Sequence, residues 1–213
     1  MARPRGIRYG QAMKTRESGM PPEDHWQTYF DPAAILTTLG VTDDFRCVID
    51  VGCGYGTFAL PAAKLIRGDV HALDIDPEMI RITSEKAAAA GLRNVHASRR
   101  DFVEDGFSFP DAVADFVMLF NILHADESPQ MLHEAKRVLV TGGKLGVIHW
   151  NHDPRTPHGP SMEIRLTPER CQEIVREAGF DVGSLLDLPP HHYGFTATLA
   201  IPRAASPRGG CRT

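Results

Sequence analysis

The stretch that decides the fold is VIDVGCGYGTF, residues 48–58. Residues 47–51 form an apolar run of strand length, glycines follow at alternate positions 52, 54 and 56, and a helix is expected from about 57 to 66. Glycine permits a tight turn and close approach of a ligand to the backbone, and the free N–H groups of the next helix can hold an anion. The stretch predicts a strand–loop–helix unit that binds a nucleoside-containing ligand.

Two carboxylates near this loop narrow the choice of ligand. Asp74 ends the next apolar run, 22 positions after Gly52, where a carboxylate that binds ribose hydroxyls is expected. Asp50 lies in the strand before the loop, where it would repel a pyrophosphate but could face a positively charged amine. The third glycine also comes one position earlier than in dinucleotide loops. S-adenosylmethionine, which is net cationic, therefore fits better than NAD.

Apolar runs of strand length and helix signals alternate outward from the loop. Four helices are predicted to start where a capping residue precedes proline, at Asp31-Pro32, Asp76-Pro77, Ser128-Pro129 and Thr167-Pro168. Further strands are expected at 69–74, 94–98, 115–120, 144–150, 181–188 and 193–201. The last two are separated by only four residues, which is too short for a parallel crossover. The pattern predicts an α/β, Rossmann-like three-layer sandwich with a seven-stranded, mostly parallel sheet and an antiparallel last strand.

The charge is unevenly distributed along the 213 residues. Eight of the 23 basic residues lie in segments 1–16 and 202–213, which contain no acid. The body between them therefore holds fifteen basic residues against all 27 acidic ones. It lacks the basic surplus that binding to a phosphate backbone needs, so nucleic acid is not expected as the main acceptor. No window approaches 18 apolar residues, so no membrane insertion is expected. The four cysteines are widely spread, with no CxxC pair and no secretory signal, and we therefore expect a cytoplasmic protein with reduced thiols.

These motifs resemble those of the class I S-adenosylmethionine-dependent methyltransferases of the UbiE-like kind (methyltransferase-domain 11 or 25 type). The resemblance covers about residues 45–201. It is carried by VIDVGCGYGTFAL (48–60), HALDIDPEMI (71–80), RRDF (99–102), ADFVMLFNILH (114–124), RVLVTGGKLGVIHW (137–150) and EAGFDV (177–182). Residues 1–44 would then be an N-terminal arm and cap helix, 45–201 the methyltransferase domain and 202–213 a flexible basic tail.

The resemblance implies roles for the matching positions. The glycine loop, with Gly52, Cys53, Gly54 and Gly56, would line the methionine end of the cofactor. Asp50 would lie near its amino group, and Asp74 would accept hydrogen bonds from both ribose hydroxyls. The remaining cofactor contacts would be Ile75 on the adenine face, Asp101 at the adenine amino group, the Phe102 backbone N–H at a ring nitrogen, and Asn121 closing the site. S-adenosylhomocysteine would be the product.

Candidate acceptor residues follow from the rule that ligands bind at the carboxyl ends of parallel strands. That edge should bring together His124, His149 and His192, ranked in this order as general base or polar anchor. No metal is expected, because the cluster His149, His152, Asp153 and His158 lacks a helical register. The remaining candidates for the acceptor site or a lid over it are Met20, Trp26, Phe30, Trp150, Arg165 and Tyr193.

Other interpretations stay open at the level of sequence. An arm with Trp26, Tyr29 and Phe30 at helical spacing could be a lid or simply a helix packed on the sheet. Arg165 could orient a polar acceptor or pair with Glu163. The rival functions are an NAD-dependent oxidoreductase and a non-catalytic regulatory module that binds S-adenosylmethionine. We expect a monomer or a homodimer that acts on a small-molecule methyl acceptor.

Overall fold

The computed structural model describes residues 22–156 and 158–199, so Met20 and the predicted basic tail lie outside the described residues. The helices are α1 Glu23–Trp26, the 3-10 helix η1 Gln27–Tyr29, α2 Pro32–Thr38, α3 Ala59–Leu65, α4 Pro77–Ala89, α5 Ser128–Val138 and α6 Pro168–Glu177. The strands are β1 Cys47–Val51, β2 Asp69–Asp74, β3 Val95–Arg99, β4 Ala114–Phe120, β5 Leu139–Trp150, β6 Phe180–Val182, β7 Leu186–Leu188 and β8 His192–Leu199.

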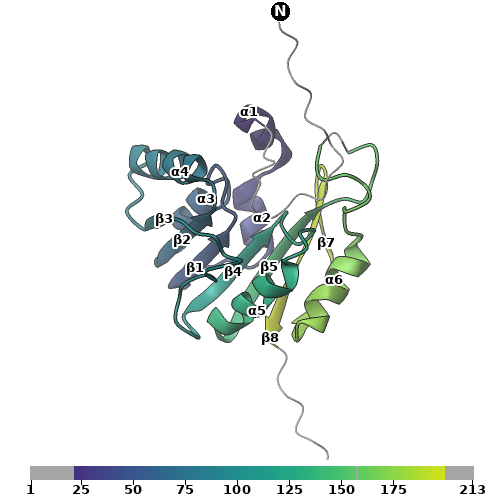
Figure 1. Cartoon of the computed structure of the whole chain (residues 1–213). Helices are drawn as coiled ribbons and strands as arrows, with labels where there is room; N and C mark the ends of the chain where they lie inside the picture. The colour runs from purple at the N-terminus through teal and green to yellow at the C-terminus, as the bar shows by residue number, and fades with distance from the viewer. Residues whose placement is uncertain (1–21, 157, 200–213) are drawn as a thin grey trace, which may run out of the picture.

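The strands form one sheet in the order β3-β2-β1-β4-β5-β8-β6, with β7 also paired to β8 (Figure 1). Neighbours from β3 to β5 are parallel, and β8 is antiparallel to β5, β6 and β7. The predicted fold class and the antiparallel last strand are therefore confirmed. The sixth predicted strand is present as two short pieces, β6 and β7, which raises the strand count from seven to eight.

Helices cover both faces of the sheet, as Figure 1 shows. One core lies beneath α5 and α6 and includes Ile49, Val117 and Val147. The other lies beneath α2 and α3 and includes Val48 and Phe116. Successive residues of a strand point to opposite faces, so two apolar layers arise from strands that are hydrophobic nearly throughout.

Three of the four predicted helix caps are confirmed. The side chains of Asp31, Asp76 and Thr167 accept hydrogen bonds from backbone N–H groups in the first turn of α2, α4 and α6. The cap predicted at Ser128 is wrong, because Ser128 is itself the first residue of α5 and no side chain caps that end. With proline in the first turn, one fewer N–H needs a partner there.

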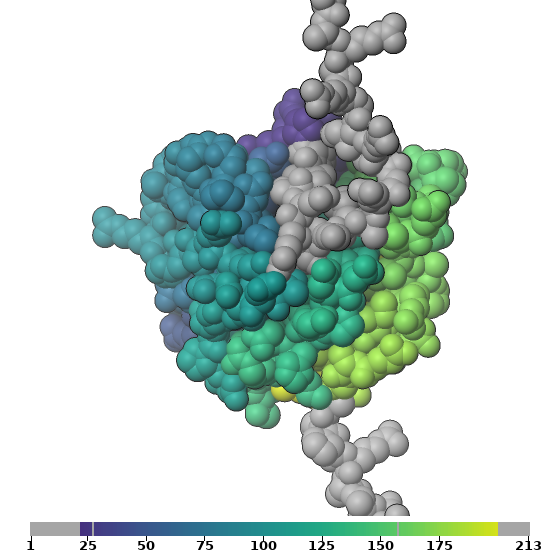
Figure 2. All heavy atoms as spheres, in the orientation of Figure 1, coloured from purple at the N-terminus to yellow at the C-terminus, as the bar shows by residue number. Residues whose placement is uncertain are grey.

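The arm before the sheet folds against it without forming one continuous helix. Trp26 ends α1, Tyr29 ends η1, and Phe30 is extended, yet all three side chains are buried. In the space-filling view the purple arm lies at the top of the molecule beside the blue surface of α4 (Figure 2). No helix in the described part of the chain is long and apolar enough to cross a bilayer.

Candidate functional site

The glycine loop is fixed to the end of β2 by its backbone. The N–H groups of Gly52 and Cys53 both donate to the carbonyl oxygen of Leu73, at 2.8 and 2.9 Å. Gly52 has a φ of +74°, and a Cβ there would lie 2.9 Å from the side chain of Ile122. The Cys53 side chain is buried, and burial raises the pKa of its thiol well above the ordinary value. The loop therefore presents main chain rather than side chains to the edge of the sheet.

Asp74 is locked in place where β2 ends. Its two carboxylate oxygens accept hydrogen bonds from the N–H of Gly54 at 2.9 Å and from the N–H of Asp76 at 3.0 Å. The side chain is largely buried, and this desolvation raises its pKa. Each carboxylate oxygen has a second lone pair, so Asp74 can still accept hydrogen bonds from a ligand.

Asp50 is the buried acid on the neighbouring strand. It is only 3 % exposed, and its Oδ2 atom has no hydrogen-bond partner among the described residues. Desolvation and the nearby Asp74 carboxylate raise the pKa of Asp50 to about 7. A buried carboxylate of this kind is stabilised by a positively charged group, and none of the described residues supplies one.

Asn121 follows β4 at the same edge. Its backbone has a φ of +57°, an uncommon conformation for a residue other than glycine, and its N–H donates to the Ile148 carbonyl at 2.8 Å. Neither polar atom of its side-chain amide has a partner among the described residues, although both are buried. Together with Asp50 and Asp74, this donor and acceptor set fits a ligand with an ammonium group and ribose hydroxyls.

The loop after β3 carries the predicted adenine contacts. The Asp101 carboxylate accepts from the N–H groups of Val103 and Glu104, at 3.2 and 3.3 Å. Phe102 is buried in the core below α5, and Ile75 is half-buried at the end of β2. The Asp101 carboxylate thus stabilises the turn that contains it. Ile75 lies in the loop after β2, and Asp101 and Phe102 lie in the loop after β3.

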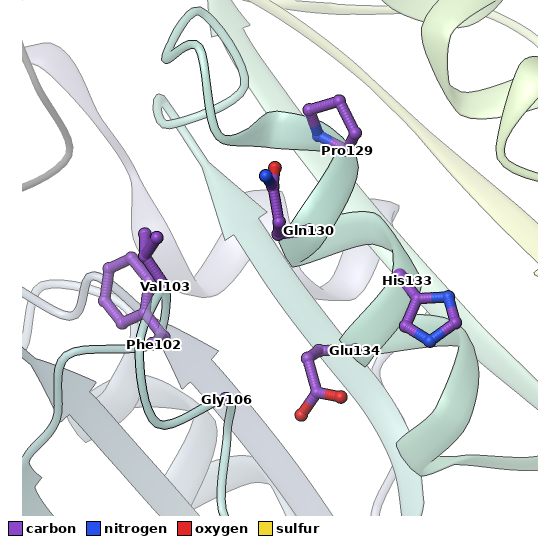
Figure 3. A pocket seen from close by; sticks show the side chains of 7 residues that line it. All are labelled: Phe102, Val103, Gly106, Pro129, Gln130, His133 and Glu134. Atoms are coloured by element: carbon purple, nitrogen blue, oxygen red, sulfur yellow. The ribbon is translucent and has the colours of Figure 1, made fainter.

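A hollow of about 410 Å³ lies between this loop and α5 (Figure 3). It is lined by Phe102, Val103, Gly106, Pro129, Gln130, His133 and Glu134. Its walls are therefore the far side of the loop and the outer surface of a helix. Its lining includes Phe102 from the predicted adenine contacts but none of Asp50, Asp74, His124, His149 and His192.

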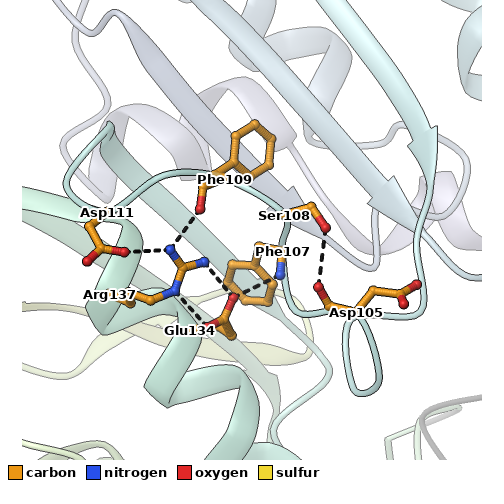
Figure 4. A network of polar contacts seen from close by, with 7 residues as sticks. All are labelled: Asp105, Phe107, Ser108, Phe109, Asp111, Glu134 and Arg137. Atoms are coloured by element: carbon orange, nitrogen blue, oxygen red, sulfur yellow. Dashed lines mark hydrogen bonds and ion pairs between the residues drawn. The ribbon is translucent and has the colours of Figure 1, made fainter.

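A polar network fixes the same loop to α5 (Figure 4). Glu134 accepts from the N–H of Phe107 at 3.0 Å and from the guanidinium of Arg137 at 2.8 Å. Arg137 also donates to the Phe109 carbonyl and to Asp111, both at 2.7 Å. These contacts hold the segment that carries Asp101 and Phe102 close to the sheet.

The three candidate histidines share an edge of the sheet but not a face. In the antiparallel register of β5 and β8, His149 lies opposite Tyr193 and Trp150 lies opposite His192. Because successive residues alternate between faces, His149 points toward α5 and α6, whereas His192 points toward α2 and the arm. The His124 ring lies 5.5 Å from that of His149, on the first of these faces.

All three imidazoles are unprotonated near neutral pH. Burial lowers the pKa of His124 to about 4 and that of His149 and His192 to about 3. His124 Nδ1, His149 Nε2 and both ring nitrogens of His192 have no hydrogen-bond partner among the described residues. Each could therefore accept a hydrogen bond or a proton from a bound molecule.

Arg165 stabilises the insert between β5 and α6. Its five N–H groups are directed at main-chain carbonyls of Asn151, Asp153, His158 and Pro160, at 2.8–3.2 Å. The carbonyl of Arg165 in turn meets the His152 ring at 2.7 Å. A guanidinium has five N–H donors, so none is left over for an acceptor. Within the described residues, no group of three His, Cys, Asp or Glu side chains could hold a metal ion.

The arm reaches both sides of the site. Lys86 on α4 forms an ion pair with Glu23 and donates to the Tyr55 carbonyl in the glycine loop at 3.2 Å. At its other end, the Tyr29 ring lies 5.4 Å from the rings of Trp150 and His158. Residues 23–30 therefore bridge α4 and the insert across the edge of the sheet.

Sequence reasoning missed two aromatic residues at this edge. Phe58 directly follows the glycine loop, and Phe120 ends β4 beside Asn121; their rings lie 4.7 Å apart. The rule that ligands bind at the carboxyl ends of strands could have identified both, because each is the last side chain before or after a loop at that edge.

Comparison with known proteins agrees with this geometry. Residues 48–143 match the family model described as a methyltransferase domain. Aklanonic acid methyltransferase DauC from a Streptomyces species is 33 % identical over 143 residues, which are 61 % of this chain and 64 % of that protein. Ajmaline N-methyltransferase from Rauvolfia serpentina is 27 % identical over 139 residues, which are 64 % and 45 % of the two chains. The chain thus spans less than two thirds of the length of these curated relatives.

A solved structure extends the match over most of the chain. An S-adenosylmethionine-dependent methyltransferase from Aquifex aeolicus superposes with a TM-score of 0.75 and 27 % identity, covering 85 % of this chain and all of that one. The similarity includes both the glycine-loop half and the antiparallel end of the sheet. Residues 48–143 therefore form a methyltransferase domain, and the chain shares the fold of an S-adenosylmethionine-dependent methyltransferase.

Proposed function

We propose that this chain transfers a methyl group from S-adenosylmethionine to a small-molecule acceptor. The observation that carries the proposal is the buried Asp50 carboxylate beside a loop made of main chain, because its Oδ2 atom has no hydrogen-bond partner among the described residues. It calls for a ligand with a positive charge, whereas a pyrophosphate there would be repelled. When bound, the cofactor supplies an electrophilic methyl group on a sulfonium centre.

The residues of the chain would then hold and align the two substrates. Asp50 faces the ammonium group, Asp74 accepts from the ribose hydroxyls, and the Phe102 turn with Ile75 and Asp101 holds the adenine. Asn121 closes the site through its side-chain amide, which has no hydrogen-bond partner within the described part of the chain. Most of the catalysis in an in-line displacement comes from aligning the nucleophile with the methyl carbon, which is a task for the walls of the acceptor site.

The acidic body and the small-molecule methyltransferases among the relatives support an acceptor that is not a nucleic acid. The candidates for contacting it are His124, His149 and His192, together with Trp26, Phe30, Trp150 and Tyr193.

The test compares ligands by isothermal calorimetry on the full chain. We expect saturable binding of S-adenosylhomocysteine and none of NAD. Binding of NAD alone would overturn the proposal and favour the oxidoreductase. A second measurement follows release of S-adenosylhomocysteine from S-adenosylmethionine with a broad panel of small acceptors. Cofactor binding without any turnover across that panel would favour a regulatory binding module instead.

A further inference from the structure

A row of rings leads from the glycine loop to His192. Phe120, beside Asn121, lies 4.7 Å from Phe58; Phe58 lies 5.1 Å from Phe30; and Phe30 lies 4.4 Å from the His192 ring. Trp150 then lies 4.2 Å from His192 on β5. We call Phe120, Phe58, Phe30, His192 and Trp150 the aromatic row. It begins beside the proposed cofactor site and lies on the face of the sheet that carries α2 and the arm.

His192 is the polar member of this row with no hydrogen-bond partner. Its side chain is 0 % exposed, and neither ring nitrogen has a partner among the described residues. Buried polar groups in folded proteins nearly always have a partner, so an imidazole with two unpartnered nitrogens indicates that a bound molecule completes the site. Its low pKa keeps the ring neutral, with one nitrogen as acceptor and the other as donor.

The residues around His192 restrict the chemistry of that molecule. Its immediate ring neighbours are Phe30 and Trp150, which favour a flat, apolar partner that can stack or meet them edge-on. A protonated amine would need a carboxylate, and the row contains none. A neutral hydroxyl satisfies the acceptor nitrogen without bringing a charge into an apolar enclosure.

We infer that the aromatic row binds a flat aromatic acceptor that carries a hydroxyl group, with the hydroxyl donating its hydrogen bond to His192. This inference rests on the proposed function and specifies its acceptor. In the reaction, the acceptor oxygen forms a bond to the methyl carbon, the carbon–sulfur bond breaks with its electron pair remaining on sulfur, and the hydroxyl proton is released to solvent. The products are a methyl ether, S-adenosylhomocysteine and a proton; His192 positions the hydroxyl and stays neutral.

The acceptor enters when the arm moves outward, because the rings of the row are now in direct contact. Phe30 belongs to the arm, and the arm is held by the ion pair between Glu23 and Lys86 and by the contacts of Tyr29. Lys86 also contacts the glycine loop through the Tyr55 carbonyl. Lys86 therefore contacts the arm and the glycine loop at the same time.

The test measures binding of matched probes to the full chain saturated with S-adenosylhomocysteine. The probes are 7-hydroxycoumarin and 2-naphthol, compared with coumarin and naphthalene, which lack the hydroxyl. In His192→Phe we expect at least a tenfold loss of affinity for the two hydroxylated probes and less than a twofold change for the others. The control is His96→Phe, an exposed histidine on β3 that contacts Asp69 rather than the arm and should leave all four affinities unchanged.

A measurement on the unaltered protein removes any dependence on how the variant folds. Nitrogen-15 NMR of the histidine rings should show a change at His192, and none at His124 or His149, when 7-hydroxycoumarin binds. The inference is overturned by equal losses for both kinds of probe, by a response at His124 or His149 instead, or by no saturable binding of either phenol. Failure of S-adenosylhomocysteine itself to bind would overturn the proposed function as well, so the two failures are distinguishable.

Discussion

The two halves of the carboxyl edge of the sheet differ in the groups that line them, which are mainly main chain in one half and side chains in the other. At the ends of β1 and β2 the site consists largely of main chain: the glycine loop, the N–H groups that Asp74 accepts from, and two fixed carboxylates. At the end of β5 and the start of β8 it consists of side chains, namely the rings of His149, Trp150 and His192 against the arm. The first half is polar and local in sequence, whereas the second is aromatic and assembled from distant segments.

We expect the main-chain half to recognise the cofactor, which is always the same molecule, and the side-chain half to recognise the acceptor, which can differ between related proteins. A loop of main chain recognises features that every molecule of one cofactor shares, and it loses little when neighbouring side chains change. An enclosure of side chains can be refitted to another acceptor by single substitutions. The comparison predicts that variants in the first half alter cofactor affinity strongly and that variants in the second half leave it nearly unchanged.

The largest expected effect is that of Gly52→Val. Valine would need a left-handed backbone and would meet the Ile122 side chain, so the loop must deform. Strain and overpacking of about 3 kcal/mol correspond to a loss of roughly a hundredfold or more in affinity for S-adenosylhomocysteine. Calorimetry measures it. The control is Gly91→Val, which has a φ of +68° but open space around it and lies away from the site; equal losses in both variants would refute the argument.

The second-largest loss of cofactor affinity is expected on removal of the Asp74 carboxylate. Asp74→Ala removes the proposed acceptor for two ribose hydroxyls and the observed acceptor for the N–H groups of Gly54 and Asp76. At about 1.5 kcal/mol for each hydroxyl contact, cofactor affinity should fall at least tenfold. Asp76→Ala is the matched control, because it removes the cap of α4 and should lower stability by about 1 kcal/mol without a comparable loss of affinity. An unchanged affinity in Asp74→Ala would contradict its assignment to the ribose.

The pH dependence of cofactor binding tests Asp50. Its pKa is raised to about 7, so the carboxylate is mostly protonated at pH 6 and mostly ionised at pH 8. The ionised form attracts the ammonium group, and affinity should therefore rise as pH rises, by about tenfold between pH 6 and pH 8. Calorimetry in buffers of matched ionic strength gives the slope. In Asp50→Asn the slope should flatten; a variant that keeps the full dependence would assign it to another group.

The smallest effect on the cofactor is expected in the other half, for Arg165→Lys. Lysine has three donors where the guanidinium uses five, so at least two hydrogen bonds are lost and at least one of the four carbonyls loses its partner. Urea unfolding should show a loss of about 1–3 kcal/mol, because buried carbonyls are left unsatisfied. Affinity for S-adenosylhomocysteine should change less than twofold. A larger change would show that the two halves are not independent.

What could be predicted from the sequence follows the same division. The glycine loop, Asp74 and three helix caps depend on neighbours a few residues away, and short-range patterns describe them well. The cap at Ser128 failed because a residue before proline can also be the first residue of a helix. The strand expected at 181–188 was found in two pieces because pairing with β8 is interrupted between Val182 and Leu186.

The half of the edge proposed to bind the acceptor depends on the pairing register of β5 and β8, which could not be predicted from the sequence. Placing three histidines at one edge follows from topology alone, but their separation onto two faces follows from pairing His149 with Tyr193 rather than with His192. A shift of one residue would have exchanged the faces. The donors of Arg165 likewise go to carbonyls that come together only when the insert folds.

Asn121 lowers the stability of the unliganded chain at a position where it can contact a ligand. Its left-handed backbone costs on the order of 1 kcal/mol relative to glycine, and its amide is buried with neither polar atom partnered among the described residues. Glycine would relieve the strain, so a chain selected for thermal endurance alone would not keep asparagine here. The strained backbone and the missing hydrogen bonds lower the stability of the unliganded protein at the boundary between the two halves. A ligand that hydrogen-bonds to the amide would supply those missing bonds and add to its own binding free energy.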